Sequence, residues 1–369
     1  MSIGDVLDRL TVAVELYKKE TDGSVRCFAC GHRCLIREGK RGICQVRFNE
    51  GGELRVPFGY VAAVQSDPIE KKPFSHVLPG SSALTFGMLG CDFHCGYCQN
   101  WFTSQAMRDP HSDESVNLVR RVSPAQMVDI AQQSGASVMV SSYNEPLITS
   151  EWAAAIFKEA KAAGLKCAYV SNGNNTPEVM EYLRPYLDAY KVDLKCMSDK
   201  KYRSLGGVLQ NTLNGIQRAR DMGLWVEVVT LVIPGFNDSN EELWDAARFL
   251  AGLSLDIPWH VTAFHKDYKM TDPEDTDART LQRAADIGRE AGLHFVYAGN
   301  LPGRVGEYED TACPSCNETL VRRRGYVVRE YRISAEGTCP KCGTKIPGVW
   351  SGNPNKVNTN GLGHPMPVY

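Results

Sequence analysis

The chain contains 369 residues, of which 43% are hydrophobic and 23% charged, and its net charge is -2. These values predict a folded protein of one or two domains with a sizeable core, and they give no reason to expect a nucleic-acid partner. Charged residues interrupt residues 1–20 too often for a signal peptide, and no run of eighteen apolar residues could span a membrane, so we expect a cytoplasmic protein.

Residues 1–20 have the pattern of a short amphipathic helix, and the first group of cysteines follows them. The chain has thirteen cysteines, eleven of them in three tight groups, which favours metal binding over a disulfide scaffold. Four thiolates suit either a zinc ion or an iron–sulfur cluster, so spacing leaves both open, with zinc preferred. The first group is Cys27, Cys30, Cys34 and Cys44, and we expect the neighbouring His32 to bind nothing.

The charged stretch 67–73 allows two interpretations: a solvated turn, or a segment that lines the mouth of the cysteine site after the next strand. From residue 84 to about 300, apolar β-rich runs alternate with helical stretches, which predicts a parallel sheet with helices outside it. Six or seven βα units make a partial barrel. We expect strands at 84–89, 137–143, 166–172, 189–195, 225–233, 259–264 and 294–298, and helices near 124–134, 151–163, 176–187, 211–222, 239–251 and 277–291.

The first strand of this pattern leads directly into Cys91, Cys95 and Cys98, spaced C-x3-C-x2-C. Three thiolates this close can share one iron–sulfur cube, which leaves one iron open to a small molecule. A zinc site would require a fourth ligand, and disulfide formation among three cysteines would leave one thiol unpaired. The spacing therefore indicates an iron–sulfur cluster with a vacant coordination position.

Polar residues also follow the other expected strands. They would lie at the carboxyl ends of the barrel strands, where active sites of such barrels are found. Cys167 lies within an apolar strand and is expected in the core, and Cys196 ends another. The polar strand ends are Ser142–Pro146, Ser171–Gly173, Asp193–Lys195, Pro234–Asp238, His260 with Phe264 and His265, and Gly299–Asn300.

After residue 300 the alternation stops, and two C-x2-C pairs stand 22 residues apart. Two turns that each present two thiolates form a closed tetrahedral site, which predicts a zinc ribbon, with rubredoxin-like iron as the alternative. A β-rich basic hairpin is expected between the pairs, and an extended arm after residue 351. The four cysteines are Cys313, Cys316, Cys339 and Cys342.

The cysteine loop, with an aromatic residue before its last cysteine, is typical of the radical S-adenosylmethionine (SAM) family. Almost the whole chain resembles the AmmeMemoRadiSam system radical SAM proteins (AmrS). A more distant resemblance is to pyruvate formate-lyase activating enzymes, which install a radical on a glycine of a partner enzyme. The matching stretches are 67–73, Cys98–Trp101, Tyr143–Pro146, Pro258–His260, Phe264–His265, Asp267–Met270, Val296–Asn300 and the terminal cysteine pairs.

This resemblance implies a radical SAM enzyme with a partial (β/α)6-type barrel. A 4Fe–4S cluster on Cys91, Cys95 and Cys98 would cleave SAM reductively, and the 5′-deoxyadenosyl radical would abstract hydrogen from an unidentified substrate. Tyr143 and Asn144 stand where glycines are usual in the SAM-binding Gly-Gly-Glu stretch, which is a departure from the family pattern. The implied SAM-binding residues are Tyr97, Asn144, Glu145, Ser171, Asn172, Asp193 and Asn300, and the implied catalytic or substrate-binding residues are Lys195, His260 and His265.

We divide the chain into a cysteine-rich segment at 1–80, a radical SAM barrel at 81–303, and a zinc-ribbon-like domain with a tail at 304–369. The resemblance also implies a reducing partner such as flavodoxin or ferredoxin, and either a protein or a small-molecule substrate. Other AmmeMemoRadiSam proteins are the implied system partners. The alternative is a non-catalytic module that binds metal at both ends and docks partners of a multi-protein system.

Overall fold

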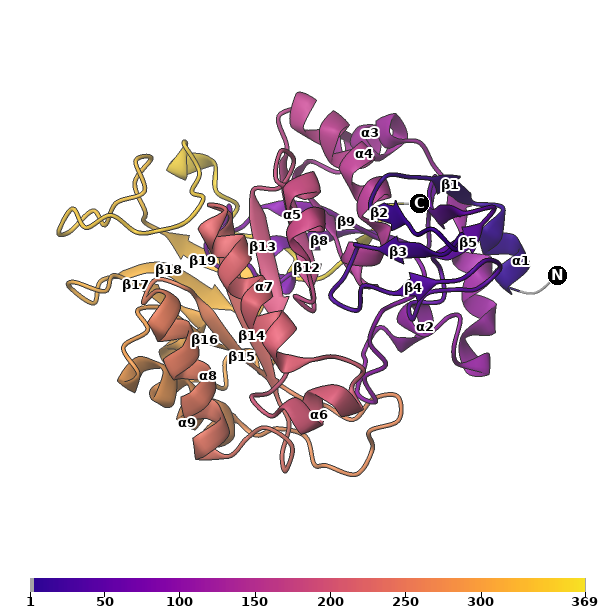
Figure 1. Ribbon diagram of the computed structural model, residues 1–369. Coiled ribbons are helices and arrows are strands. Elements are labelled where there is room, and N and C mark those ends of the chain that lie inside the picture. Colours follow the sequence, from indigo (N-terminus) through magenta and orange to yellow (C-terminus); the bar gives the residue numbers. More distant parts are fainter. Residues whose placement is uncertain (1–2, 369) are drawn as a thin grey trace.

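The computed structural model describes residues 3–368, and within them a nine-stranded sheet forms the centre of the molecule (Figure 1). Its order is β16-β15-β14-β13-β12-β11-β9-β8-β20, and every pair from β9 to β16 is parallel. The seven parallel strands are β9 (Ser82–Gly87), β11 (Ala136–Ser141), β12 (Lys166–Ser171), β13 (Ala189–Asp193), β14 (Trp225–Val232), β15 (Trp259–Ala263) and β16 (Val296–Gly299).

Helices cover the outer face of this sheet and bury a common core of Leu, Ile, Val, Ala and aromatic side chains against it. Helix N-termini are capped by side chains that accept hydrogen bonds from otherwise unpaired backbone N–H groups. These side chains belong to Ser123, Thr176, Ser239 and Asp277. The helices are α2 (Trp101–Ser104), α3 (Pro124–Gln133), α4 (Ser150–Ala162), α5 (Pro177–Leu183), α6 (Asp199–Ser204), α7 (Leu209–Asp221), α8 (Asn240–Leu253) and α9 (Ala278–Glu290). The expected partial barrel is confirmed, and each expected strand and helix has a counterpart.

The first twenty residues do not form one helix, so that prediction was wrong. Helix α1 (Ile3–Asp8) ends early, and β1 (Thr11–Ala13) pairs with β6 (Glu53–Pro57). Thr11 and Val12 favour β structure, and Val12 lies opposite Val56 of the partner strand. The other strands here are β2 (Tyr17–Lys19), β3 (Val25–Cys27), β4 (Leu35–Ile36) and β5 (Phe48–Glu50), with β7 (Tyr60–Val61) pairing β10 (Arg120–Arg121).

The stretch 69–80 lies at the amino-terminal end of the parallel strands and joins β8 (Ala63–Pro68) to β9. Ser75 and His76 donate backbone N–H groups to the carboxylate of Glu227 on β14, each at 2.9 Å. Asp67, Glu70 and Lys72 are buried. The interpretation of 67–73 as a solvated turn is therefore wrong.

The C-terminal region begins with β17 (Thr311–Ala312), β18 (Thr319–Arg324) and β19 (Val327–Tyr331). Figure 1 places this small sheet and the N-terminal cysteine-rich segment at opposite ends of the barrel. The tail then returns to the barrel, where β20 (Met366–Pro367) pairs antiparallel with β8. The expected arm is thus extended and docked on the edge of the main sheet.

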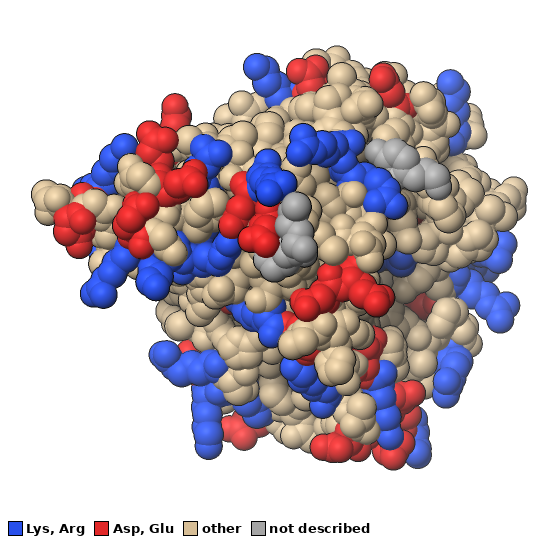
Figure 2. All heavy atoms as spheres, turned by 90° about the vertical axis from the view of Figure 1, so that its right-hand side faces the viewer, with Lys and Arg blue, Asp and Glu red and all other residues tan. Residues whose placement is uncertain are grey.

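The outer surface carries charges of both signs. Figure 2 shows basic and acidic side chains interspersed over the face that bears α1. No helix in the described part of the chain is both long and apolar enough to cross a membrane.

Candidate active site

The three central cysteines line one cavity at the carboxyl ends of the strands. Cys95 is buried, and Cys91 and Cys98 are partly buried, in a loop packed against Phe93, Tyr97 and Phe264. Burial raises the pKa of the Cys95 thiol to about 12, so its thiolate form calls for a bound cation. The cavity is also lined by five residues implied to bind SAM, namely Asn144, Glu145, Ser171, Asn172 and Asp193, and by Lys195, which is implied to be catalytic or substrate-binding.

Asp92 holds the cysteine loop in place. Its fully buried carboxylate accepts hydrogen bonds from the side-chain amides of Asn172, at 2.7 Å, and Asn174, at 2.8 Å. Both asparagines follow β12, so the bonds tie the first strand-end loop to the third. The Nε2 atom of His32 lies 3.9 Å from the same carboxylate and has no hydrogen-bond partner.

Glu145 joins two further strand-end loops. Its carboxylate accepts from the Ser171 hydroxyl at 2.7 Å, the Asn172 backbone at 2.8 Å and the Leu147 backbone at 3.1 Å. The Asn144 side chain is also engaged, because its oxygen accepts the Met88 N–H at 3.0 Å. These two side chains therefore shape the cavity wall through contacts within the protein.

Tyr143 stands where the family pattern has glycine, and its backbone has the left-handed φ of +68° that glycine would adopt easily. Its hydroxyl donates to Asp67 at 2.6 Å, and the Lys72 ammonium lies 4.3 Å from its ring centroid. Burial alone would raise the pKa of Asp67, but Lys72, Tyr143 and Lys71 hold it below its usual value. Burial lowers the pKa of Lys72 to about 8.

The cysteine cavity continues into a second, larger one inside the barrel. Cys95, Cys98, Asp193 and Lys195 line both cavities. Tyr97 and Asn300, both implied to bind SAM, line the second one. The stretch 67–73 contributes Lys71, Lys72 and Pro73 to its wall, as the second interpretation of that stretch expected.

The structure does not bring His260 and His265 to the cysteines' cavity. His260 lines a smaller cavity together with residues of the stretch 69–80. Its ring contacts the Glu227 carboxylate at 2.7 Å. His265 is exposed, and its Nε2 lies 2.9 Å from the Gln99 side chain at the rim. Cys167 and Cys196 are both buried, as expected for Cys167.

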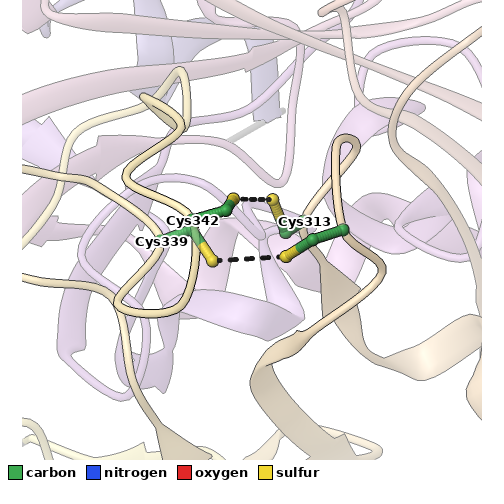
Figure 3. A group of neighbouring side chains, drawn as sticks. Cys313, Cys339 and Cys342 are labelled. Carbon is green, nitrogen blue, oxygen red and sulfur yellow. Dashed lines mark hydrogen bonds between the residues drawn. The ribbon is translucent and has the colours of Figure 1, made fainter.

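The C-terminal cysteines come together as two facing pairs (Figure 3). The Sγ atoms of Cys313 and Cys342 lie 3.5 Å apart, and those of Cys316 and Cys339 lie 3.7 Å apart. Two thiolates bound to a tetrahedral zinc at about 2.3 Å would stand about 3.8 Å apart. The described part of the chain contains no other group of three or more His, Cys, Asp or Glu ligand atoms within 4.8 Å of one another.

The N-terminal cysteines lie beside the central loop. The Arg108 guanidinium joins the two, since it donates to the backbone oxygens of both Ile43 and Phe93. Cys27, Cys30 and Cys44 are buried and Cys34 is partly buried. Their sulfur atoms stand too far apart to form a compact group like the C-terminal one.

A family model, the Radical SAM superfamily, matches residues 86–250. An uncharacterized protein of Methanocaldococcus jannaschii is 33% identical over 335 residues, which span 89% of this chain and 97% of that protein. The chain belongs to the radical SAM superfamily.

This radical SAM enzyme is also similar to known activating enzymes. The pyruvate formate-lyase-activating enzyme of Staphylococcus aureus is 28% identical over 229 residues, spanning 56% of this chain and 88% of that enzyme. Among solved structures, a radical SAM methyltransferase from Sphaerobacter thermophilus is 17% identical with a TM-score of 0.46. That match spans 62% of this chain and 70% of the methyltransferase.

Three charged residues of the barrel interior were not predicted from the sequence as part of the site: Asp92, Lys191 and Glu227. Lys191 and Asp193 alternate along β13 and therefore face the same side, and Lys195 follows just after the strand. Glu227 likewise interrupts an otherwise apolar strand. A charged residue at an inward position of a buried strand was the available signal for both.

Proposed function

We propose that this enzyme cleaves SAM reductively at a 4Fe–4S cluster on Cys91, Cys95 and Cys98, and uses the product to abstract a hydrogen atom from its substrate. One observation carries the proposal: the three cysteines and the polar ends of β11, β12 and β13 line a single cavity. Three thiol donors fit a cluster that leaves one iron open. When bound, the cluster supplies the electron and SAM the hydrogen-abstracting group.

The chain's own residues position and shield this chemistry. Asp92 and Glu145 lock the loops that carry the cysteines and the cavity wall, so the site is formed before a ligand enters. Phe93, Tyr97 and Phe264 pack as an apolar layer around the cysteine loop, which limits water access. Asp193 and Lys195 place one negative and one positive charge on the wall shared by both cavities, and these suit the ammonium and carboxylate groups of SAM.

The test is anaerobic reconstitution with iron and sulfide, followed by dithionite and SAM, with 5′-deoxyadenosine as the readout. The wild type should release it, and Cys95→Ala should lose both release and the iron of that site. Cys167→Ala is the matched control, because this cysteine is buried in the core away from the cavities. No release from a fully loaded wild-type cluster would favour a non-catalytic metal-binding module.

The two outer cysteine groups are proposed to hold different metals. The close pairing of Cys313 with Cys342 and of Cys316 with Cys339 supports a single zinc ion. The wider separation of the N-terminal sulfurs supports an iron–sulfur cluster there, in place of the zinc that we preferred where spacing left both open. Metal analysis of the Cys91, Cys95 and Cys98 triple alanine variant tests this, since its remaining iron and sulfide would belong to the N-terminal group.

We also propose that the enzyme belongs to the AmmeMemoRadiSam system proteins and works in the cytoplasm with a reducing partner such as flavodoxin or ferredoxin. Similarity to activating enzymes supports a protein substrate. Incubation of the reconstituted enzyme, SAM and dithionite with cell extract tests this: a modified protein that forms together with 5′-deoxyadenosine supports it, whereas a modified small molecule contradicts it.

A further inference from the structure

The cavity inside the barrel is unusually rich in lysine. Four lysines and one aspartate line it, on β13, just after β13 and on the segment that follows β8. Lys195 also lines the cavity of the three cysteines, whereas the other lysines lie only along the deeper part. The deeper lysines are Lys71, Lys72 and Lys191.

These ammonium groups outnumber the carboxylates that face them. Asp67 accepts from Lys71 at 2.9 Å and from Lys72 at 2.7 Å, and Asp193 contacts Lys191 and lies 3.9 Å from Lys195. Among the described residues, two carboxylates are thus shared by four ammonium groups. The Asp67 carboxylate also accepts a hydrogen bond from the Tyr143 hydroxyl, so it must share its acceptor oxygens among three donors.

Nearby acidic groups are already engaged elsewhere. Glu70 accepts the Gly80 N–H at 2.9 Å and lies 3.9 Å from Arg323, while Glu227 contacts His260. Lys72 and Lys191 are each only 5% exposed at the side chain, so solvent does little to offset their charge. Lys72 and Lys191 each share their carboxylate partner with a second lysine, so the group keeps a net positive charge that an anionic ligand would offset.

We propose, building on the function above, that the substrate carries an acidic group, a carboxylate or a phosphate, which binds between Lys71, Lys72 and Lys191. At the other end of the cavity, near Lys195 and the cysteines, SAM would bind. Tyr326, on the hairpin between β18 and β19, closes the far wall, and its hydroxyl donates to the Asn300 side-chain oxygen at 3.1 Å. Binding there orients the substrate from its acidic end, so that a hydrogen further along it points toward the cysteines.

The test titrates the reconstituted full-length enzyme with inorganic phosphate and, separately, with acetate, at constant ionic strength and with SAM present. Calorimetry should detect saturable binding of at least one probe. Phosphate binding alone would assign a phosphate group and acetate binding alone a carboxylate. Lys71→Met should weaken binding about tenfold, because it removes one charge-assisted contact. Lys71→Arg should retain most of the affinity.

Lys158→Met is the matched control, because this lysine is exposed on the outer helix α4. Lys71 is partly exposed, so its variant tests the site even if Lys72→Met fails to fold. Binding that saturates equally in wild type and Lys71→Met, or no saturable binding of either anion, would overturn the proposal. Parallel assay of 5′-deoxyadenosine by the wild type separates this outcome from failure of SAM cleavage itself.

Discussion

The Tyr143 hydroxyl donates a 2.6 Å hydrogen bond to the Asp67 carboxylate, across the interior of the barrel. This bond links the loop after β11 to β8, and it helps to hold Tyr143 at its left-handed φ of +68°. Tyr143→Phe keeps the ring but leaves Asp67 with one donor fewer. We expect a loss of about 1–2 kcal/mol in the free energy of unfolding and a higher KM for SAM, measured by urea denaturation and 5′-deoxyadenosine assays.

Tyr186→Phe serves as the control, because Tyr186 packs on the outside of the barrel. Equal effects of the two substitutions would mean that the bond to Asp67 has no special role.

Gly87, the last residue of β9, lies against the loop that contains Tyr143. A Cβ atom added there would lie 2.5 Å from the Ser142 oxygen and 2.9 Å from the Tyr143 Cβ. Gly87→Ala should therefore push the two loops apart, lower the free energy of unfolding by about 1–3 kcal/mol and reduce iron loading of the central site. Gly252→Ala is the control: it has open space in helix α8 and should stabilise slightly. Unchanged iron loading in a folded Gly87→Ala variant would count against this coupling.

His76 should make the enzyme less stable in acid. It is fully buried, and burial lowers its pKa to about 4, although Glu227 opposes the shift. Between pH 6.5 and 4 the unfolded chain therefore gains a proton that the folded chain does not. The free energy of unfolding should fall by up to about 3 kcal/mol as pH decreases through this range.

Substituting His76→Asn should flatten this pH slope, measured by urea denaturation at several pH values. A slope that survives the substitution unchanged would assign the effect to other groups. Glu227, His260 and Arg323 are the charged or titratable neighbours that bear on His76.

The C-terminal cysteines should stabilise one wall of the barrel cavity. Cys313 and Cys339 belong to the ribbon's apolar core, and Tyr326 extends from the same small domain to the cavity. Cys339→Ser should remove about one metal ion per chain and lower the free energy of unfolding by at least about 2 kcal/mol. Elemental analysis should show the central iron unchanged. Retention of the full metal content would contradict a closed site of four thiolates.

Much of this molecule was predictable because the signals are local. The C-x3-C-x2-C loop and the terminal pairs place ligands within a few residues of one another, so sequence spacing alone indicates shared metal sites. Hydrophobic periodicity likewise predicted the strands and helices from residue 84 to 300, because each element buries one face or both against its neighbours.

Only the tertiary structure decided which distant groups meet. Asp67 and Tyr143 are far apart in sequence but bonded inside the barrel, and the same folding draws 67–73 out of solvent. His260 occupies an inward position of β15, yet its depth along the strand places it with Glu227 and away from the cysteines. The depth of a residue in a barrel depends on how the strands are staggered. The sharing of charge between separate segments depends on which segment fills the interior. No local sequence pattern encodes the stagger or the filling segment.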